Sequence, residues 1–570
     1  MRTLLNKLRE FKGANIVLFV VFATTIYLQC CFFHESLILP GLKVVTPYML
    51  VFKASIAIFI ASFIFLFKHK SWTIVVSVLI NMWGISNIMY QRANGILIDA
   101  YSITMVGNMD GFWSSVPFYM RSSDFIIYLT SLTVILTYVL FKNKRREISN
   151  GILGLIIAII VHIYGYEMRV RSHSAYKPFL VKKYYNPYSL DKTHFACWDL
   201  YDNAHYTRET SIIHHFIYQT HFFFSKIVFP DTYTLTDGES NQARKFIKPN
   251  NKNVIPERAL YIIVVESLET WAINPYSMPN LYQFIQKENI LYAPNLKCQT
   301  RGGTSADGQM IINTGLLPTK EGAVCFRYPR NTFPSLSKLY KTSFNVIPGG
   351  QTVWNQSLMN TAYGIKDNFD GSLNDKDLIE QFIEKYNKYD YGMMLTMSTH
   401  SPFNAYAHLS SLSIPVGAPT SFSNYLKSFN YTDQCLATLF SAIESNEKLK
   451  NSTVVITADH TVFNKELRDS FNDFCKQNNL SLSITSEGYC PLIIYSPNIE
   501  GNKVVNETAY QMDIFPTILN VIGCEDYYWN GFGINLLEKD TNNRKIEDYP
   551  ALELSDKLHQ ANYFKSIEQE

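Results

Sequence analysis

The sequence predicts a domain of five membrane-spanning helices followed by an extracytoplasmic α/β domain with a mostly parallel central sheet. Two observations lead to this fold class. The first half contains five apolar runs, each close to the roughly 20 residues that an α-helix needs to cross a bilayer. In the second half, short and almost entirely apolar runs alternate with helical patterns, which is typical of parallel strands that are buried on both faces.

The apolar runs of the first half lie near Asn15–Phe33, Pro47–Phe67, Trp72–Tyr90, Asp124–Phe141 and Ser149–Tyr166. Lys and Arg accumulate on the cytoplasmic side of membrane proteins. Here they gather at the N-terminus and in the second-to-third and fourth-to-fifth connections, whereas the other two connections contain few. We therefore expect residues 1–166 to form a multi-pass domain in the inner (cytoplasmic) membrane of a bacterium, with everything after Tyr166 outside the cytoplasm.

The chain after the membrane domain divides into a connector and one large domain. We expect residues 167–257 to form a juxtamembrane connector, in which Ser211–Ile227 forms an interfacial amphipathic helix. Residues 258–570 suit a single α/β domain. The net charge of +3 is explained by the basic membrane loops, so no nucleic-acid partner is expected, and no oligomeric state is indicated.

Polar side chains follow three of the predicted strands. Glu266 ends the first apolar run, His400 follows another, and Asp459 with His460 ends a third. Alone, Glu266 could cap a helix and His400 could be an ordinary loop histidine, but a buried strand has no packing reason to end in Asp-His. Because open α/β sheets bind ligands at the carboxyl ends of their strands, one crevice can collect all four side chains. Carboxylates and imidazoles together predict one divalent metal ion, Mn²⁺ or Zn²⁺, with Mg²⁺ as an alternative.

Seven short motifs follow one another along the second half: Val264–Ser267, Gln299–Ser305, Trp354-Asn355, Thr399–Phe403, Ala458–His460, Pro491–Pro497 and Gln511–Leu519. In order and spacing they resemble the alkaline phosphatase/sulfatase superfamily, and within it the membrane-bound lipoteichoic acid synthase-like enzymes. The resemblance implies a sulfatase-like fold for the α/β domain.

The resemblance also implies the roles of the central residues. Thr304 would be the nucleophile and would bind the metal ion together with Glu266, Asp459 and His460. Ser305 is the rival nucleophile. Sulfatases carry a Cys/Ser-x-Pro-x-Arg motif at this place, whereas residues 304–308 contain neither Pro nor Arg. Sulfate-ester hydrolysis is therefore not expected.

Four further residues are implied to bind the substrate. His400 would contact the phosphate and transfer protons. Trp354 would line the headgroup pocket. Lipoteichoic acid synthases carry an arginine two positions after this tryptophan, where this chain has Gln356. Arg301, beside the nucleophile, is a candidate for the missing phosphate contact.

The implied reaction transfers a phosphoglycerol-type headgroup from a membrane phospholipid, through phosphorylated Thr304, to a hydroxyl on an envelope glycan or lipid, and it releases diacylglycerol. A phosphoethanolamine transferase acting on lipid A or an envelope glycan is the alternative. Such enzymes generally carry another histidine soon after the Asp-His pair, and residues 461–468 contain none. A non-catalytic membrane sensor is a third hypothesis, which the four intact central residues argue against.

Seven of the nine cysteines fall outside the predicted membrane helices. An exported domain permits disulfides. The sequence favours the pairs Cys298–Cys325, which bracket the Thr304 loop, and Cys475–Cys490, which bracket a polar insertion.

Overall fold

The computed structural model forms two compact units, Met1–Ala100 with Tyr119–Pro230, and Tyr101–Phe118 with Asp231–Glu570. The residues that it describes are 13–36, 46–67, 69–94, 97–102, 119–141, 148–175, 207, 209–228, 233–248, 254–538 and 546–569. We call the two units the membrane unit and the catalytic unit.

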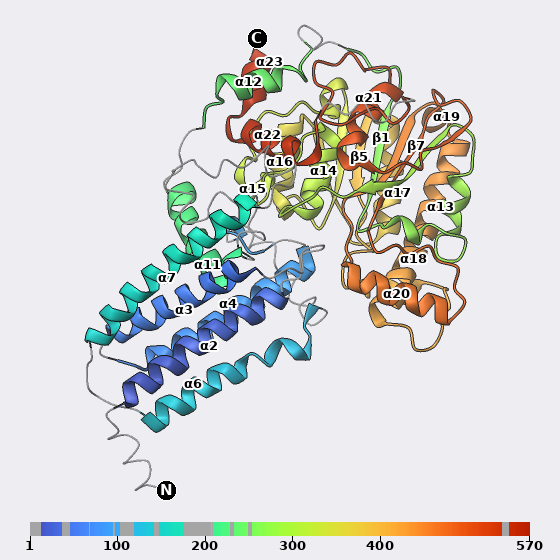
Figure 1. Cartoon of the computed structure of the whole chain (residues 1–570). Coiled ribbons are helices and arrows are strands. Elements are labelled where there is room, and N and C mark those ends of the chain that lie inside the picture. The colour runs from blue at the N-terminus through green and yellow to red at the C-terminus, as the bar shows by residue number, and fades with distance from the viewer. Residues whose placement is uncertain are drawn as a thin grey trace. The chain divides into compact units, whose positions relative to one another are not determined.

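The membrane unit contains the five helices that the sequence predicts. They are α2 (Ala14–Ser36), α3 (Pro47–Phe65), α4 (Trp72–Asn94), α6 (Tyr128–Phe141) and α7 (Ile148–Ala175) (Figure 1). Within the described residues, five segments are long and apolar enough to cross a membrane. Phe22, Ile56, Ile88 and Val134 pack in their shared core, whereas apolar side chains such as Ile160 are 60 % exposed, as expected for a lipid-facing surface. The prediction of a multi-pass membrane domain is confirmed.

Two shorter helices follow in the chain. Helix α11 (Ile212–Phe222) begins after Ser211, whose side chain accepts from His214 N–H, and continues into the π-helical turn η3 (Phe223–Val228). His215 Nε2 lies 2.8 Å from the Ile98 carbonyl oxygen. Helix α12 (Asp237–Arg244) has a capping box formed by Thr236 and Glu239.

The catalytic unit is built on a nine-stranded sheet of order β4-β3-β5-β1-β6-β7-β2-β8, with β9 also paired to β2. The strands are β1 (Leu260–Val265), β2 (Ile290–Lys297), β3 (Ser343–Pro348), β4 (Asp367–Gly371), β5 (Tyr391–Leu395), β6 (Thr453–Ala458), β7 (Cys490–Tyr495), β8 (Asn502–Val504) and β9 (Ala509–Tyr510). Only β7 runs antiparallel to its neighbours β6 and β2 among these strands. The predicted mostly parallel sheet is therefore confirmed.

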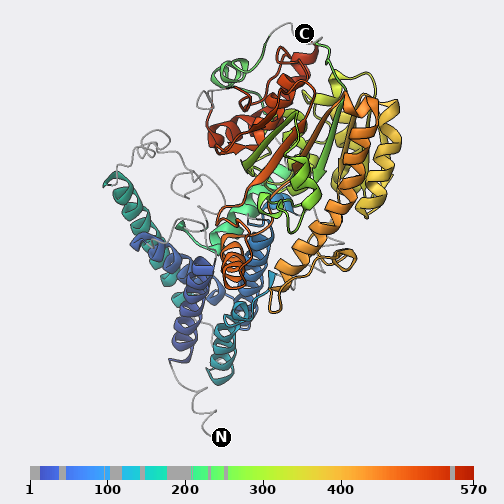
Figure 2. The same ribbon diagram turned by 90° about the vertical axis from the view of Figure 1, so that its right-hand side faces the viewer.

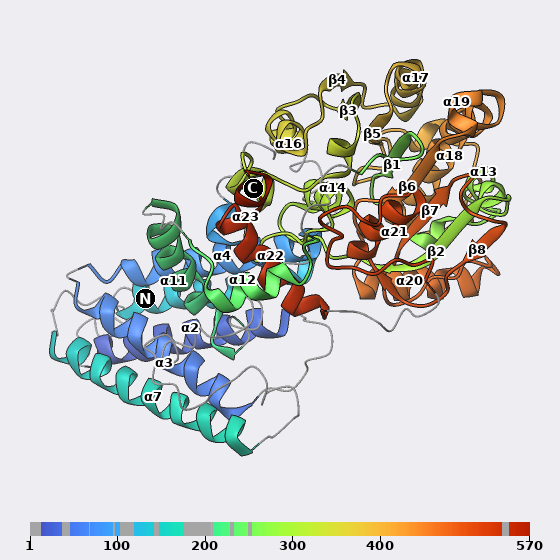
Figure 3. The ribbon, with the colours of Figure 1, turned by 90° about the horizontal axis from the view of Figure 1, so that it is seen from above.

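Helices cover both faces of this sheet. Helices α13 (Pro279–Phe284), α17 (Asp375–Lys385) and α18 (Thr420–Ser445) lie along one face, and α14 (Thr304–Thr314), α16 (Gln356–Tyr363) and α21 (Ile514–Val521) lie along the other (Figure 3). Seen from the side, the strands run together between these layers (Figure 2). The remaining helices of eight or more residues in this unit are α20 (Lys465–Gln477) and α22 (Asp548–Gln560), apart from α12.

The sheet brings three chain segments to one edge. Strand β1 is entirely buried and pairs in parallel with both β5 and β6, with Val264 opposite Leu395 and Val265 opposite Ala458. Residues that directly follow these strands must therefore lie side by side at the carboxyl edge, where open α/β sheets bind ligands.

Candidate metal centre

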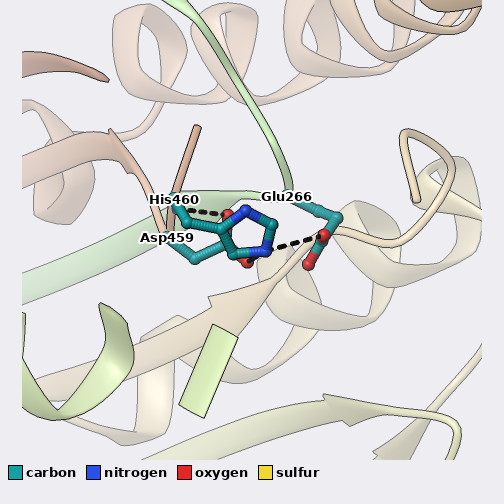
Figure 4. Close-up of side chains that lie close together, drawn as sticks. All are labelled: Glu266, Asp459 and His460. Carbon is teal, nitrogen blue, oxygen red and sulfur yellow. Dashed lines mark hydrogen bonds and ion pairs between the residues drawn. The ribbon is translucent and has the colours of Figure 1, made fainter. Parts of the chain in front are cut away.

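Glu266, Asp459 and His460 meet at this edge of the sheet. Glu266 follows β1, and Asp459 and His460 follow β6; one ligand atom of each lies within 4.8 Å of the others (Figure 4). His460 Nε2 lies 3.5 Å from Glu266 Oε1 and 3.4 Å from Asp459 Oδ2. Both carboxylates are buried. Two carboxylates and one imidazole facing a common point are a donor set that suits Zn²⁺ or Mn²⁺.

The two carboxylate oxygens of Asp459 differ in their hydrogen bonds, and one of them, at the place where the three side chains meet, has no partner within the described part of the chain. Asp459 Oδ1 accepts the backbone N–H groups of Ser267 and His460, each at 2.8 Å. Asp459 Oδ2 is buried and has no hydrogen-bond partner among the described residues. A buried carboxylate oxygen without a partner is costly. A divalent cation at the centre of the three side chains would remove that cost, so the residues fit a metal ion.

The electrostatics of the three groups agree with this interpretation. Burial works against the charged form of Glu266, but the hydrogen bond and charge of His460 outweigh it and hold the pKa of Glu266 below its usual range. Burial and the nearby Glu266 raise the pKa of Asp459 well above its usual range. Burial alone would lower the pKa of His460, yet Asp459 and Glu266 raise it well above the usual value. The site thus attracts positive charge.

The backbone of Glu266 is held by the segment that follows the neighbouring strand β5. Its N–H donates to Thr396 Oγ1 at 3.0 Å, and its carbonyl accepts from Thr399 Oγ1 at 2.7 Å. Ser267 adopts a left-handed conformation with φ of 60° and donates its hydroxyl to Glu266 Oε1 at 2.8 Å. Such a strained residue is typical of a functional turn. The sequence carries only weak signals for these supporting contacts, and they were not predicted.

Thr304 begins helix α14 and has a positive φ of 38°. The turn before it is closed by Asp307, whose carboxylate accepts the N–H groups of Arg301 at 3.0 Å and Gly303 at 2.9 Å. Burial raises the pKa of Asp307 to about 7. A Cβ atom at residue 303 would lie 2.2 Å from Asp307 Oδ1, so any larger residue there would have to displace the Asp307 carboxylate that closes the turn.

Ser305, next to Thr304, contacts two of the three candidate ligands, Glu266 and His460. Its hydroxyl donates to Glu266 Oε2 at 3.1 Å and lies 3.3 Å from His460 Nε2. The structure therefore brings the start of α14 to the metal centre, with the rival hydroxyl of Ser305 in direct contact and Thr304 at the neighbouring position.

Among the other predicted site residues, His400 interacts with the centre, whereas Arg301 and Trp354 have contacts elsewhere. His400 is exposed, its Nδ1 lies 2.8 Å from the Ser401 carbonyl oxygen, and its charge acts on Glu266. Arg301 donates through Nε to the Lys320 carbonyl at 3.2 Å. Trp354 has a positive φ of 51°, and its ring contacts Phe326 with 5.8 Å between the ring centroids.

Gln356 contacts helix α14. Its Nε2 donates to Gln309 Oε1 of α14 at 3.3 Å. Its own Oε1 is buried and has no hydrogen-bond partner among the described residues. The carbonyl of this amide is therefore an available acceptor beside α14.

Both predicted disulfides are wrong. Every cysteine that the structure describes is a free thiol. Antiparallel pairing of β2 with β7 places Leu296 opposite Cys490, so Cys298 lies beside Cys490 and the two thiols are hydrogen-bonded. Cys325 instead belongs to the short helix α15 (Val324–Arg327), and Cys475 belongs to α20. The hydrogen bond from Cys490 is the main cause that lowers the pKa of Cys298, to about 5.

Two family models match the chain. The Sulfatase model matches residues 260–524, and the Lipoteichoic acid synthase N-terminal domain model matches residues 1–212. Along most of its length the chain is therefore similar to the lipoteichoic acid synthase-like phosphotransferases of the alkaline phosphatase/sulfatase superfamily.

Relatives of this phosphotransferase agree with that assignment over most of their length. Lipoteichoic acid synthase 2 of Bacillus subtilis (strain 168) is 23 % identical over 537 residues, which is 84 % of this chain and 77 % of the relative. Lipoteichoic acid synthase of Staphylococcus aureus (strain USA300) is 21 % identical over 539 residues, or 87 % and 79 %.

The solved structures that match the chain include a lipoteichoic acid synthase and a phosphoethanolamine transferase. The lipoteichoic acid synthase LtaP from Listeria monocytogenes has a TM-score of 0.45 at 16 % identity, covering 58 % of this chain and 98 % of that chain. The lipooligosaccharide phosphoethanolamine transferase A (EptA) from Neisseria meningitidis has a TM-score of 0.49 at 11 % identity, covering 89 % and 95 %.

Proposed function

We propose that this enzyme transfers the phosphoglycerol headgroup of a membrane phospholipid to a hydroxyl group on an envelope glycan or lipid and releases diacylglycerol. The observation that carries the proposal is the meeting of Glu266, Asp459 and His460 with the start of α14, which presents Thr304 and Ser305. The names of the curated relatives, lipoteichoic acid synthases, support phosphoglycerol as the transferred group.

Glu266, Asp459, His460 and Thr304 would hold one divalent metal ion, Mn²⁺ or Zn²⁺. When bound, the ion supplies a Lewis acid that lowers the pKa of a coordinated hydroxyl and neutralises phosphate charge. The protein residues supply the nucleophile, its orientation and the proton transfers.

In the first step, Thr304 Oγ1, which loses its proton to solvent before this step and is again deprotonated after the second, forms a bond to phosphorus while the bond from phosphorus to the glycerol oxygen of diacylglycerol breaks. His400 donates a proton to that leaving oxygen. In the second step, His400 takes the proton of the acceptor hydroxyl, whose oxygen forms a bond to phosphorus as the bond to Thr304 breaks. Each step transfers one phosphodiester and one proton, so the enzyme returns to its starting state.

Helix α14 would contribute to phosphate binding through its position. It is 11 residues long and begins at Thr304. The free N–H groups and dipole at a helix N-terminus favour negative charge. The phosphate that joins Thr304 would thus lie against this end of the helix, with Arg301 as the nearest cationic residue of the preceding turn.

The headgroup pocket would involve Trp354 and Gln356. The Gln356 Oε1 carbonyl lacks a partner among the described residues, and an amide carbonyl accepts from a glycerol hydroxyl or from an ethanolamine ammonium group. This observation keeps phosphoethanolamine transfer to lipid A or an envelope glycan as the second candidate function. A neutral glutamine recognises the headgroup by hydrogen bonding and adds no charge to phosphate binding.

We place the catalytic unit outside the cytoplasm of a bacterium, because the basic loops of the membrane unit favour this orientation. In functional terms the chain would divide into the membrane domain 1–166, the connector 167–257 and the sulfatase-like domain 258–570.

Diacylglycerol release from phospholipid vesicles tests the proposal. The full-length protein in detergent is mixed with vesicles of phosphatidylglycerol or phosphatidylethanolamine, with Mn²⁺ and then with a chelator. We expect release from phosphatidylglycerol that stops with the chelator. Thr304→Ala should abolish release and Thr304→Ser should retain part of it, since the hydroxyl survives.

Thr361→Ala is the matched control, because Thr361 is exposed and its hydroxyl bonds only within α16, to the Ser357 carbonyl. It should release diacylglycerol at the native rate. Release from phosphatidylethanolamine alone would replace the first candidate with the second. Native release by Thr304→Ala would contradict the proposed nucleophile.

A further inference from the structure

The ring of His460 is oriented through its second nitrogen. His460 Nε2 faces Glu266 and Asp459, whereas Nδ1 lies 3.1 Å from the Thr461 carbonyl oxygen. A carbonyl oxygen only accepts hydrogen bonds, so Nδ1 carries a proton in this contact and Nε2 is the nitrogen left to bind a metal ion, which would displace any proton there. The position of the Thr461 carbonyl therefore fixes both the tautomer and the direction of the imidazole.

The same peptide group is held at its other end by Glu269. The carbonyl of Thr461 and the N–H of Val462 belong to one planar peptide unit. The Val462 N–H donates to Glu269 Oε1 at 3.0 Å, and the Phe463 N–H donates to the same oxygen at 3.1 Å. Glu269 is thus separated from the His460 ring by a single rigid peptide group.

Glu269 is itself fixed on all sides. Its carboxylate is fully buried and forms a bidentate ion pair with Arg468 of α20, with contacts of 2.8 Å to Nε and 2.7 Å to Nη2. Trp271 Nε1 donates to Glu269 Oε2 at 2.8 Å. The backbone N–H of Glu269 donates to the Tyr425 hydroxyl at 2.9 Å, and that hydroxyl donates to the Ser267 carbonyl at 3.0 Å. Buried, fully bonded groups of this kind have one well-defined position.

Glu269 also links the two chain segments that carry the candidate metal ligands, one after β1 and one after β6. Glu269 lies three residues after Glu266 on the segment that follows β1, and it holds the segment that follows His460 after β6. A carboxylate that served only to neutralise Arg468 would not need two backbone N–H groups from the loop that bears a candidate ligand.

We propose that Glu269, held by Arg468, is a positioning residue for the metal ligand His460. It acts through the peptide group between Thr461 and Val462 and does not touch the substrate. The inference rests on the proposed metal centre, and it assigns to this buried ion pair a role in metal affinity in addition to its role in stability. Partners that orient a metal-binding histidine typically change metal affinity by about 10–100-fold when they are replaced.

Titration of Mn²⁺ into the full-length protein in detergent, with free Mn²⁺ measured by electron paramagnetic resonance, tests this inference. Glu269→Gln should weaken Mn²⁺ binding by about tenfold or more, because the amide group cannot accept from both Trp271 and Arg468 while it holds the Val462 N–H. The EPR signal of the bound ion should also change, since its imidazole ligand is turned.

Asp433→Asn is the control for general destabilisation. Asp433 is another fully buried carboxylate that accepts two backbone N–H groups, Asn280 at 3.0 Å and Leu281 at 2.8 Å, at the start of α13. This variant should melt at a lower temperature than the native protein and bind Mn²⁺ with native affinity.

A second comparison keeps the test valid if Glu269→Gln folds poorly. Arg468→Met leaves the Glu269 carboxylate on the Val462 and Phe463 N–H groups, whereas the double variant Glu269→Leu with Arg468→Met removes the carboxylate without leaving a buried charge unpaired. We expect the double variant to bind Mn²⁺ about tenfold more weakly than Arg468→Met. Equal affinities in this pair, or native affinity in folded Glu269→Gln, would overturn the inference. Absence of Mn²⁺ binding by the native protein would instead contradict the proposed metal centre.

Discussion

For Gly308→Ala, helix propensity predicts a stabilising effect, whereas tertiary packing predicts a destabilising one. It lies inside α14, where alanine is normally favoured over glycine by up to about 1 kcal/mol. However, a Cβ atom at this position would lie 2.3 Å from the carbonyl oxygen of Asp459 and 2.8 Å from its Cα. The backbone of α14 thus lies directly against the backbone of Asp459, a candidate metal ligand.

The displacement that Gly308→Ala requires follows from these distances. Ordinary contacts of a Cβ atom begin near 3.4 Å, so the 2.3 Å separation must grow by about 1 Å. The atoms in the way belong to the backbone at the end of β6, which cannot rotate aside. A shift of about 1 Å between the groups of an active site costs about 100-fold in rate. We therefore expect Gly308→Ala to reduce diacylglycerol release by about 100-fold and to weaken Mn²⁺ binding.

The assay compares Gly308→Ala with Gly238→Ala, using lipid release and Mn²⁺ titration on the same preparations. Gly238 also lies in a helix, α12, and a Cβ atom there would meet nothing within 4 Å. Gly238→Ala should therefore retain native activity and native or slightly higher stability. Native turnover and Mn²⁺ affinity in Gly308→Ala would refute the close approach of α14 to Asp459 as a requirement of the site.

Three further predictions concern the ligands, the pH dependence and the topology. Replacing Glu266, Asp459 or His460 by Ala should abolish bound metal and turnover while the membrane unit stays folded; full metal content by elemental analysis in all three variants would exclude them as ligands. Burial lowers the pKa of His559 from 6.5 to about 4. Below about pH 6.5 the unfolded chain therefore binds a proton at this residue that the folded chain does not. The free energy of unfolding should fall by up to about 3 kcal/mol as the pH drops toward 4. Melting curves should show His559→Gln losing this pH dependence, and equal slopes in both proteins would contradict it. A reporter active only in the cytoplasm, fused after Glu570, should be silent, and activity there would overturn the orientation.

The parts of the fold that the sequence predicts are those set by local pattern. The five membrane helices follow from continuous apolar runs, and the ends of β1 and β6 follow from short buried runs that stop at Glu266 and at Asp459. Parallel pairing at one edge then brings these side chains together, as expected. Thr304 was reached through family resemblance, and its left-handed φ of 38° is a feature that composition does not encode.

The contacts that the sequence did not predict join segments far apart in the chain. The Glu269–Arg468 pair spans 199 residues, and no local pattern distinguishes this glutamate from a surface residue. The wrong cysteine pairs have a similar cause, because the position of Cys298 depends on the antiparallel strand β7 within an otherwise parallel region. Two cysteines that lie on either side of a loop in the sequence need not be neighbours in the fold, because strand pairing decides which residues lie side by side. The orphan carbonyl of Gln356 likewise becomes visible only once α14 and α16 are packed together.

The central claim, a covalent phosphodiester on Thr304, is tested most directly by mass spectrometry of the tryptic peptide that covers residues 302–320, after brief incubation of the full-length protein with phosphatidylglycerol and Mn²⁺. His400→Ala should still give the adduct, but more slowly, because the hydroxyl of Thr304 remains while proton transfer to the leaving diacylglycerol oxygen is lost. The account predicts the mass of one phosphoglycerol group on Thr304 and no such mass in Thr304→Ala. The same mass on Ser305, whose hydroxyl lies 3.1 Å from Glu266 Oε2, would contradict it.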